Sequence, residues 1–399
     1  MKHVLYTISL ILLFCSVVEG AFAALSDRAM PYSASGEAVE NPVKIRKKKK
    51  PEVKLVMKYG AVYEGETSGK RPHGYGKMVY PGGDVYEGSF VKGKREGAGV
   101  LNLKNGDVYE GEFRDDRRNG KGKLRFADGR VYEGCWNDDR HDGFGRMDFP
   151  NGDFFVGTWN DGVRAGFGTY RYSTGAFYIG DWHNDQYCGM GAFTWCNGDC
   201  YTGGWFAGKR QGNGRFVMAD GSTYICSWVD GSCEGYGEFF SADGDIYAGG
   251  FLDGKWHGKG EFTAADGTSY SGEFKDGMCH GKGKMVFPCG AVYEGGWVEN
   301  KREGYGVYTW PNGDVYSGEW KNNLMHGAGK LHLASGDEYR GGYVNGAEEG
   351  AGVAIDKRGL RYEGCFVEGE RDGKFIIRNS DGDLVGECVF EKETVKDVK

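Results

Sequence analysis

The 399-residue sequence contains no Asn-x-Ser/Thr glycosylation acceptor, no apolar run of membrane-spanning length and no recurring cysteine pattern. Its N-terminal apolar stretch covers residues 4–18, whereas a membrane-spanning helix needs about 20 apolar residues. The ten cysteines beyond Cys15 do not recur at facing positions. A disulfide-stapled scaffold would require such positions, so the pattern favours free thiols in a reducing compartment.

An excess of positive charge is also lacking outside the N-terminus. Residues 1–54 carry nine Lys/Arg and five Asp/Glu, while the rest of the chain carries 41 and 52. Because nucleic-acid affinity comes mainly from neutralised phosphates, an acidic chain of this kind is a poor nucleic-acid binder. We therefore expect no nucleic-acid partner.

Catalytic patterns are missing as well. Residues 74–76 (Gly-Tyr-Gly) and their copies resemble the start of a dinucleotide-binding loop, but the third glycine is absent and no helix is expected to follow. Histidines and carboxylates such as His280 and Asp372 are isolated, and no triad or ligand cluster recurs. The sequence predicts a non-enzymatic protein with no catalytic residues, no metal site and no cofactor.

What the chain does contain is a 23-residue repeat. The stretch Tyr316–Gly336 reads YSGEWKNNLMHGAGKLHLASG, and an aromatic residue recurs at this spacing from Tyr63 to Tyr362, fourteen times without insertion. Each of these lead aromatics is followed by a glycine after 11 residues and by another after 20 residues. A fixed period indicates a repeat array in which each repeat contacts only its neighbours.

Two strands are predicted in each repeat, because residues 316–320 and 327–333 both alternate with period two. Residues 321–326 are expected to form a loop between them. In nine of fourteen repeats the second turn is Asn-Gly or Asp-Gly, which predicts a two-residue hairpin. Glycines beside aromatic residues allow rings of neighbouring strands to lie over bare backbone. The predicted fold is all-β: an elongated, single-layer, twisted ribbon of antiparallel hairpins.

The sequence divides into four parts. Residues 1–23 have the charged start, apolar middle and Ala-x-Ala end of a secretory signal, which translation from Met30 would remove. Residues 24–54 are predicted to be a disordered basic linker. The array occupies residues 55–390, with a half repeat at each end, and residues 391–399 form a polar tail.

The repeats resemble a known family. They have the form Tyr-x-Gly-x-Trp-x5-His-Gly-x-Gly, as in Tyr316, Gly318, Trp320, His326, Gly327 and Gly329. This pattern is similar to MORN repeats (membrane occupation and recognition nexus), over residues 55 to about 390. The resemblance implies a hairpin ribbon that acts as a scaffold, as in junctophilins, radial-spoke proteins and protist cytoskeletal proteins. The chain resembles the array-only members and has no room for the kinase domain of some plant relatives.

Two candidate binding sites follow from the repeat and its leader. Tryptophan occupies one repeat position in seven repeats: Trp136, Trp159, Trp182, Trp205, Trp228, Trp297 and Trp320. These rings either only cover glycines or also line a groove for an apolar or amphipathic segment of a partner protein. The leader carries the basic cluster Arg46, Lys47, Lys48, Lys49 and Lys50, which is either a solvated charge run, a nuclear signal or a contact for anionic lipid.

These features predict a structural scaffold or adaptor that links membrane or cytoskeletal structures to partner proteins. The alternatives are a phospholipid-binding (phosphoinositide-binding) membrane-association module and an accessory subunit of a lipid-signalling enzyme. We expect a cytoplasmic location at the cytoskeleton or a membrane, or the secretory pathway if the leader is used. Unpaired strand edges at the ends of the ribbon would allow a homodimer.

Overall fold

The computed structural model describes residues 53–398 as 31 β-strands without a helix. The leader, Met30 and the basic cluster of residues 46–50 lie outside the described residues. The chain forms two compact units, an N-terminal unit ending at Gly99 and a C-terminal unit beginning at Val100. A helix long and apolar enough to cross a bilayer is not found within residues 53–398.

The strands alternate between two lengths, and each repeat contributes one of each. The first strand of each repeat has seven residues: β2 (Val62–Ser68), β4 (Val85–Val91), β6 (Val108–Arg114), β8 (Val131–Asn137), β10 (Phe154–Asn160), β12 (Phe177–His183), β14 (Cys200–Phe206), β16 (Thr223–Val229), β18 (Ile246–Leu252), β20 (Ser269–Lys275), β22 (Val292–Val298), β24 (Val315–Lys321), β26 (Glu338–Val344) and β28 (Arg361–Val367). The second has nine: β3 (Arg71–Val79), β5 (Lys94–Asn102), β7 (Arg117–Arg125), β9 (Arg140–Asp148), β11 (Val163–Arg171), β13 (Gln186–Thr194), β15 (Lys209–Val217), β17 (Ser232–Phe240), β19 (Lys255–Thr263), β21 (Met278–Val286), β23 (Lys301–Thr309), β25 (Leu324–His332), β27 (Ala347–Ile355) and β29 (Glu370–Arg378). The remaining strands are β1 (Val53–Val56), β30 (Leu384–Glu391) and β31 (Thr394–Val398).

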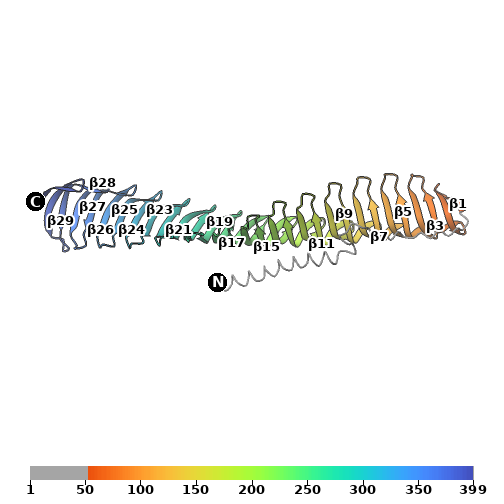
Figure 1. Cartoon of the computed structure of the whole chain (residues 1–399), viewed down its shortest axis with the longest axis horizontal. Helices are drawn as coiled ribbons and strands as arrows, with labels where there is room; N and C mark the ends of the chain where they lie inside the picture. Colours follow the sequence, from red (N-terminus) through yellow and green to blue (C-terminus); the bar gives the residue numbers. More distant parts are fainter. Residues whose placement is uncertain (1–52, 399) are drawn as a thin grey trace, which may run out of the picture. The chain divides into compact units, whose positions relative to one another are not determined.

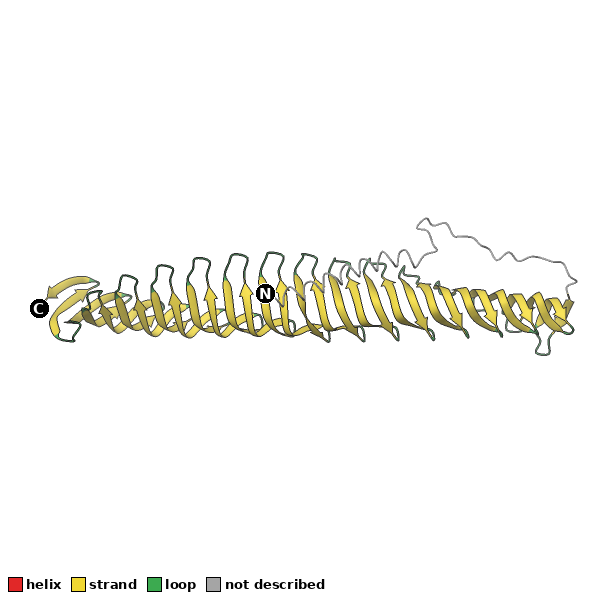
Figure 2. Ribbon diagram, turned by 90° about the horizontal axis from the view of Figure 1, so that it is seen from below, coloured by secondary structure: helices red, strands yellow, loops and turns green. Residues whose placement is uncertain are grey.

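Consecutive strands pair antiparallel within each unit. In the N-terminal unit β1 to β4 pair in sequence order, and in the C-terminal unit β6 to β31 do the same. Figure 1 shows this order from β7 onwards, and Figure 2 shows the strands of the C-terminal unit in one layer. The predicted all-β ribbon of hairpins is confirmed. The last strand, β31, lies within the segment interpreted as a polar tail.

Both turns of a repeat differ in length from the prediction. The expected loop 321–326 is a two-residue turn in which Asn322 and Asn323 both have positive φ, 47° and 70°, as a type I′ turn requires. The Asn197-Gly198 turn has three residues instead of two. Trp195 N–H donates to the Asp199 carbonyl at 2.9 Å, and Gly198 alone takes positive φ, at 96°.

The three-residue turn is favoured by hydrogen bonds between turns. Asn197 Oδ1 accepts from the Asp199 N–H at 3.1 Å, which holds the asparagine in its own turn. Asp199 Oδ1 in turn accepts from the Ala219 N–H of the next repeat at 2.8 Å. The same bond joins Ala334 to Asp314. The aspartate that follows the Asn-Gly dipeptide therefore links neighbouring turns, and the dipeptide alone does not reveal this link.

The lead tyrosines form the core. Tyr109 is 0% exposed, and its ring lies where a Cβ on Gly122 would be, so only glycine fits there. The Tyr109 hydroxyl donates to the Glu112 carbonyl at 3.0 Å. Its ring meets Phe113 and Trp136 edge to face, at centroid distances of 5.1 and 5.2 Å. The expected packing of rings over glycines is confirmed.

Cys226 interrupts this packing. It stands two residues after the lead Tyr224, where the other thirteen repeats have glycine. Tyr224 is only partly buried, whereas the neighbouring lead residues Tyr201 and Tyr247 are 0% exposed. The Cys226 side chain occupies the space that the ring takes in other repeats.

Cys226 is bonded to Cys233, with the two Cα atoms 5.9 Å apart. The expectation of free thiols is wrong for this pair, while eight other cysteines among the described residues are free. The comparison of equivalent repeat positions missed the pair because the two cysteines occupy different positions of one repeat. The hairpin of β16 and β17 brings them together by pairing Trp228 with Cys233.

Candidate protein-binding surface

The seven candidate tryptophans lie in the core of the C-terminal unit. Their exposed fractions run from 3% at Trp182 to 7% at Trp205. Each indole N–H donates to a glycine carbonyl of the preceding strand, as Trp182 does to Gly168 at 3.1 Å. The indoles therefore present little surface, and the groove stays a prediction. Its accessible surface would have to come from side chains packed beside the tryptophans.

Such side chains exist on the face of the sheet that carries the lead rings. Five partly exposed rings follow one another on β11, β13 and β15 and directly after the first two of these strands: Tyr170, Tyr172, Phe193, Trp195 and Phe216. Successive ring centroids are 4.6, 6.0, 4.5 and 5.7 Å apart. We call this set the aromatic strip. Contiguous exposed aromatic surface of this kind is typical of interfaces.

Hydrogen bonds hold the strip in place. The hydroxyls of Tyr172 and Tyr187 lie 2.6 Å apart. Tyr170 donates to Asp153 Oδ2 at 2.8 Å, while Asp153 Oδ1 accepts from the Ser173 N–H at 2.8 Å. These bonds lower the pKa of Asp153, the Ser173 backbone bond most of all. The Tyr170 and Tyr172 rings are thus held in a fixed orientation.

Arginines border the strip on both sides. The Arg164 guanidinium lies 4.5 Å from the Trp182 ring and 5.4 Å from the Tyr170 ring. Arg210 lies 5.2 Å from the Phe216 ring, and burial lowers its pKa. Both arginines come nine residues after a lead aromatic. The surface thus combines aromatic rings with two guanidinium groups, of which that of Arg164 is already paired with Asp185 at 2.8 Å.

In other repeats, the position nine residues after the lead aromatic carries a neutral ring instead of arginine. His141 stacks on Tyr132 at a centroid distance of 3.8 Å, and burial lowers its pKa to about 4. The imidazole is therefore uncharged near pH 7, as its place among aromatic rings requires. This histidine packs in the core rather than acting as an acid or base.

The strip was not predicted from the sequence because the predicted site residues occupy a different position of the repeat. Strip residues come 15 or 17 residues after a lead aromatic, not four. The position 15 residues after the lead aromatic does show a pattern in the sequence. Five successive repeats carry Tyr or Phe there, at Tyr170, Phe193, Phe216, Phe239 and Phe262, where the four preceding repeats carry Met or Leu.

Comparison with known families agrees with the repeat geometry. A model of the MORN repeat matches thirteen segments: residues 63–85, 86–108, 109–129, 132–154, 155–177, 178–200, 201–223, 224–246, 247–269, 270–291, 293–315, 316–338 and 362–374. The chain belongs to the MORN-repeat family. MORN repeats are a non-enzymatic scaffold module, and residues 339–361 form the one complete repeat that the family model passes over. No curated protein sequence matches this MORN-repeat chain.

Solved structures resemble the chain only distantly. The TCP domain of Drosophila melanogaster SAS-4, in complex with a proline-rich motif of Ana2, is 15% identical, with a TM-score of 0.26 over 45% of this chain and 96% of that one. The TCP10 domain of Danio rerio CPAP with a STIL peptide is 10% identical, with a TM-score of 0.10 over 85% of this chain and 100% of that one. These superpositions are too poor to inform function.

Proposed function

We propose that this MORN-repeat protein is a non-enzymatic scaffold and that the aromatic strip receives an apolar segment of a partner protein. The observation that carries the proposal is the row of partly exposed rings from Tyr170 to Phe216. Asp153 holds Tyr170, and Arg164 and Arg210 border the row. Aromatic residues and arginine are the types most enriched at binding hot spots.

The experiment compares two tryptophans of the same repeat position. Trp195 belongs to the strip, whereas Trp310 lies 17 residues after Tyr293, in a repeat outside it. The full chain, Trp195→Ser and Trp310→Ser are used in parallel to purify partners from native cells. A captured partner is then purified and its affinity for each of the three proteins is measured.

We expect the Trp195→Ser substitution to weaken binding about tenfold or more, as the loss of a hot-spot aromatic residue does, while Trp310→Ser binds as the natural chain does. Equal affinities for all three proteins would contradict the proposal. Both side chains are partly exposed, so loss of folding is not expected from either substitution.

The proposed link to membranes or the cytoskeleton rests on the family and on the basic cluster of residues 46–50, which lies outside the described residues. It is tested by liposome flotation with vesicles containing phosphatidylserine or phosphoinositide. Neutral substitutions at Lys47 to Lys50 should abolish flotation if the cluster is the contact. Unchanged flotation would exclude it.

A further inference from the structure

One repeat departs from the others at two positions of the ring-bearing face. The repeat that begins at Tyr339 carries Glu348 nine residues later, where six repeats carry arginine: Arg95, Arg118, Arg164, Arg210, Arg302 and Arg371. It also carries Ala354, where the other repeats have Met, Leu, Ile, Phe or Tyr. This is the repeat that the family model leaves unmatched.

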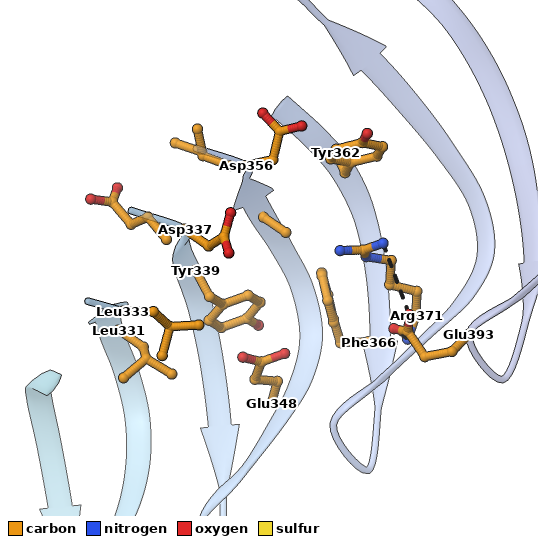
Figure 3. Close-up of a pocket in the computed structure, with 13 residues that line it drawn as sticks. Leu331, Leu333, Asp337, Tyr339, Glu348, Asp356, Tyr362, Phe366, Arg371 and Glu393 are labelled. Atoms are coloured by element: carbon orange, nitrogen blue, oxygen red, sulfur yellow. Dashed lines mark hydrogen bonds and ion pairs between the residues drawn. The ribbon is translucent and has the colours of Figure 1, made fainter. Parts of the chain in front are cut away.

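A cavity of about 330 Å³ lies beside the small side chain of Ala354 and is lined by this repeat and by residues on either side of it. Its apolar lining includes Leu331, Leu333, Tyr339 and Phe366. Figure 3 shows the Glu348 carboxylate among these side chains. The cavity therefore combines aromatic surface with the Glu348 carboxyl group, and Arg371 lies at its wall.

Four other carboxylates line the cavity, and each of them has a partner. Glu338 pairs with Lys330 at 2.7 Å. Asp356 pairs with Arg358 at 2.7 Å, and Asp337 accepts from the Lys357 N–H at 2.8 Å. Glu393 accepts from the Arg371 N–H at 2.7 Å and lies 3.9 Å from the Arg371 guanidinium.

Glu348 differs from these acids. The Glu348 side chain is half-buried, and among residues 53–398 its carboxylate forms no hydrogen bond or ion pair. Burial raises its pKa to about 7, against a smaller opposing effect of Arg371. Opposite it in the strand register, Tyr343 is 2% exposed, and its hydroxyl lacks a hydrogen-bond partner among the same residues. A half-buried carboxylate without a partner has lost part of its hydration, and a bound cation would compensate for that loss.

In other repeats, an arginine at the position of Glu348 packs against aromatic rings. Arg118, Arg210 and Arg302 lie over the rings of Trp136, Trp228 and Trp320 at 4.4, 4.1 and 4.3 Å. In those repeats the lead tyrosine and this tryptophan meet edge to face, for example Tyr201 and Trp228 at 5.3 Å.

The same arrangement of rings is present in the divergent repeat, without the arginine. Tyr339 and Phe366 meet at 4.8 Å with an interplanar angle of 79°. The rings that receive a guanidinium elsewhere are thus retained, and a carboxylate has replaced the internal cation. Rings together with a carboxylate form a receptor for a cation.

We propose that the cavity at Glu348 binds an arginine side chain of a partner protein. The guanidinium would stack on Tyr339 and Phe366, as the internal arginines stack on the equivalent rings, and would pair with Glu348. Arg371 lies at the cavity wall, engaged with Glu393 and with the Tyr362 ring at 5.0 Å. The proposal is independent of the aromatic strip.

The test titrates the full chain with the peptide acetyl-Gly-Arg-Gly-amide, observed by ligand-detected NMR. A second peptide carries citrulline, which has the shape of arginine without its charge. We expect the arginine peptide to bind about tenfold or more tightly than the citrulline peptide, because only arginine can form a charged hydrogen bond with Glu348. Equal binding of the two peptides would overturn the proposal.

Three variants locate the site. Glu348→Arg restores the residue of six other repeats and should fill the cavity from within, so peptide binding is expected to disappear while the protein remains folded. Glu348→Gln should weaken binding about tenfold. Glu349→Gln removes the same charge one residue away, on the opposite face of the strand, and should leave binding unchanged.

If Glu349→Gln weakens binding as much as Glu348→Gln, the effect is general electrostatics and the proposal fails. Tighter binding of spermidine than of the arginine peptide would show that the cavity takes a small polyamine and would overturn the assignment to a protein side chain. The strip is unchanged in all three variants, so loss of strip binding cannot explain any of these outcomes.

Discussion

The packing of rings over glycines makes a strong prediction for Gly88 of the N-terminal unit. A Cβ at Gly88 would lie 2.5 Å from the Gly99 Cα, 2.5 Å from the Tyr86 hydroxyl and 2.7 Å from the Ala98 carbonyl. Gly88→Ala must therefore displace the buried Tyr86 ring and also push the neighbouring strand away. Gly88 has no positive φ, which means that backbone strain does not contribute. The displacement of Tyr224 beside Cys226 is the natural counterpart of this substitution.

The magnitude follows from what Tyr86 loses. Burial of an aromatic ring contributes about 1.5–3 kcal/mol, and the hydrogen bond to the Ser89 carbonyl at 3.0 Å contributes about 1 kcal/mol. The edge-to-face contact with Phe90 at 5.0 Å adds about 0.5–1.5 kcal/mol. Alanine recovers about 0.5–1 kcal/mol through the unfolded state. We expect a net destabilisation of about 3 kcal/mol.

The assay is hydrogen exchange of β3 and β4 in the full chain, because a repeat array need not unfold in one step. Gly82→Ala is the matched control, since a Cβ at Gly82 meets nothing within 4 Å and this glycine also lacks positive φ. Its exchange free energies should stay within about 0.5 kcal/mol of the natural chain. Equal protection in Gly88→Ala and Gly82→Ala would refute the packing argument.

Two further predictions concern the divergent repeats. The folded-state pKa of Glu348, about 7, lies above the unfolded value, so the folded state binds the extra proton and stability should fall as pH rises from about 4.5 to 7. After allowance for solvent screening the loss is about 1–2 kcal/mol. It is measured by urea unfolding at pH 5 and 8, and an equal loss in Glu348→Gln would contradict it. Under reducing conditions, Cys226→Gly should let the Tyr224 ring enter the core and stabilise the protein by about 1–2 kcal/mol relative to Cys233→Ser. Equal unfolding midpoints for these two variants would rule this out.

The strands and the core could be predicted because a local pattern determines them. Period-two alternation and the glycines after each lead aromatic specify which faces pack, so Tyr316, Gly318 and Trp320 lie on the face expected. The turns could not be predicted from the dipeptides alone. The geometry around Asn197 depends on hydrogen bonds with Asp199 and with the next repeat, which no single turn contains.

The sequence predicted an aromatic groove but did not place it at the residues of the strip. An aromatic interface was expected, but the column of tryptophans turned out to be core, since each indole N–H bonds a glycine carbonyl. The exposed fraction of an aromatic side chain depends on whether a glycine lies beneath its ring. The strand register must be known before that glycine can be identified. Tyr178 sinks over Gly191, whereas its register partner Phe193 stays partly exposed. The cavity at Glu348 likewise becomes apparent only when the rings of this repeat are compared with the equivalent rings of the other repeats.

The central claim is that a partner protein covers the aromatic strip. Hydroxyl-radical footprinting of the full chain, alone and with its purified partner, measures this directly, because partly exposed aromatic rings are oxidised when free. We expect the partner to protect Tyr172, Phe193 and Trp195, while Trp310 is oxidised equally in both samples. Unchanged oxidation of the strip in the presence of bound partner would contradict the account.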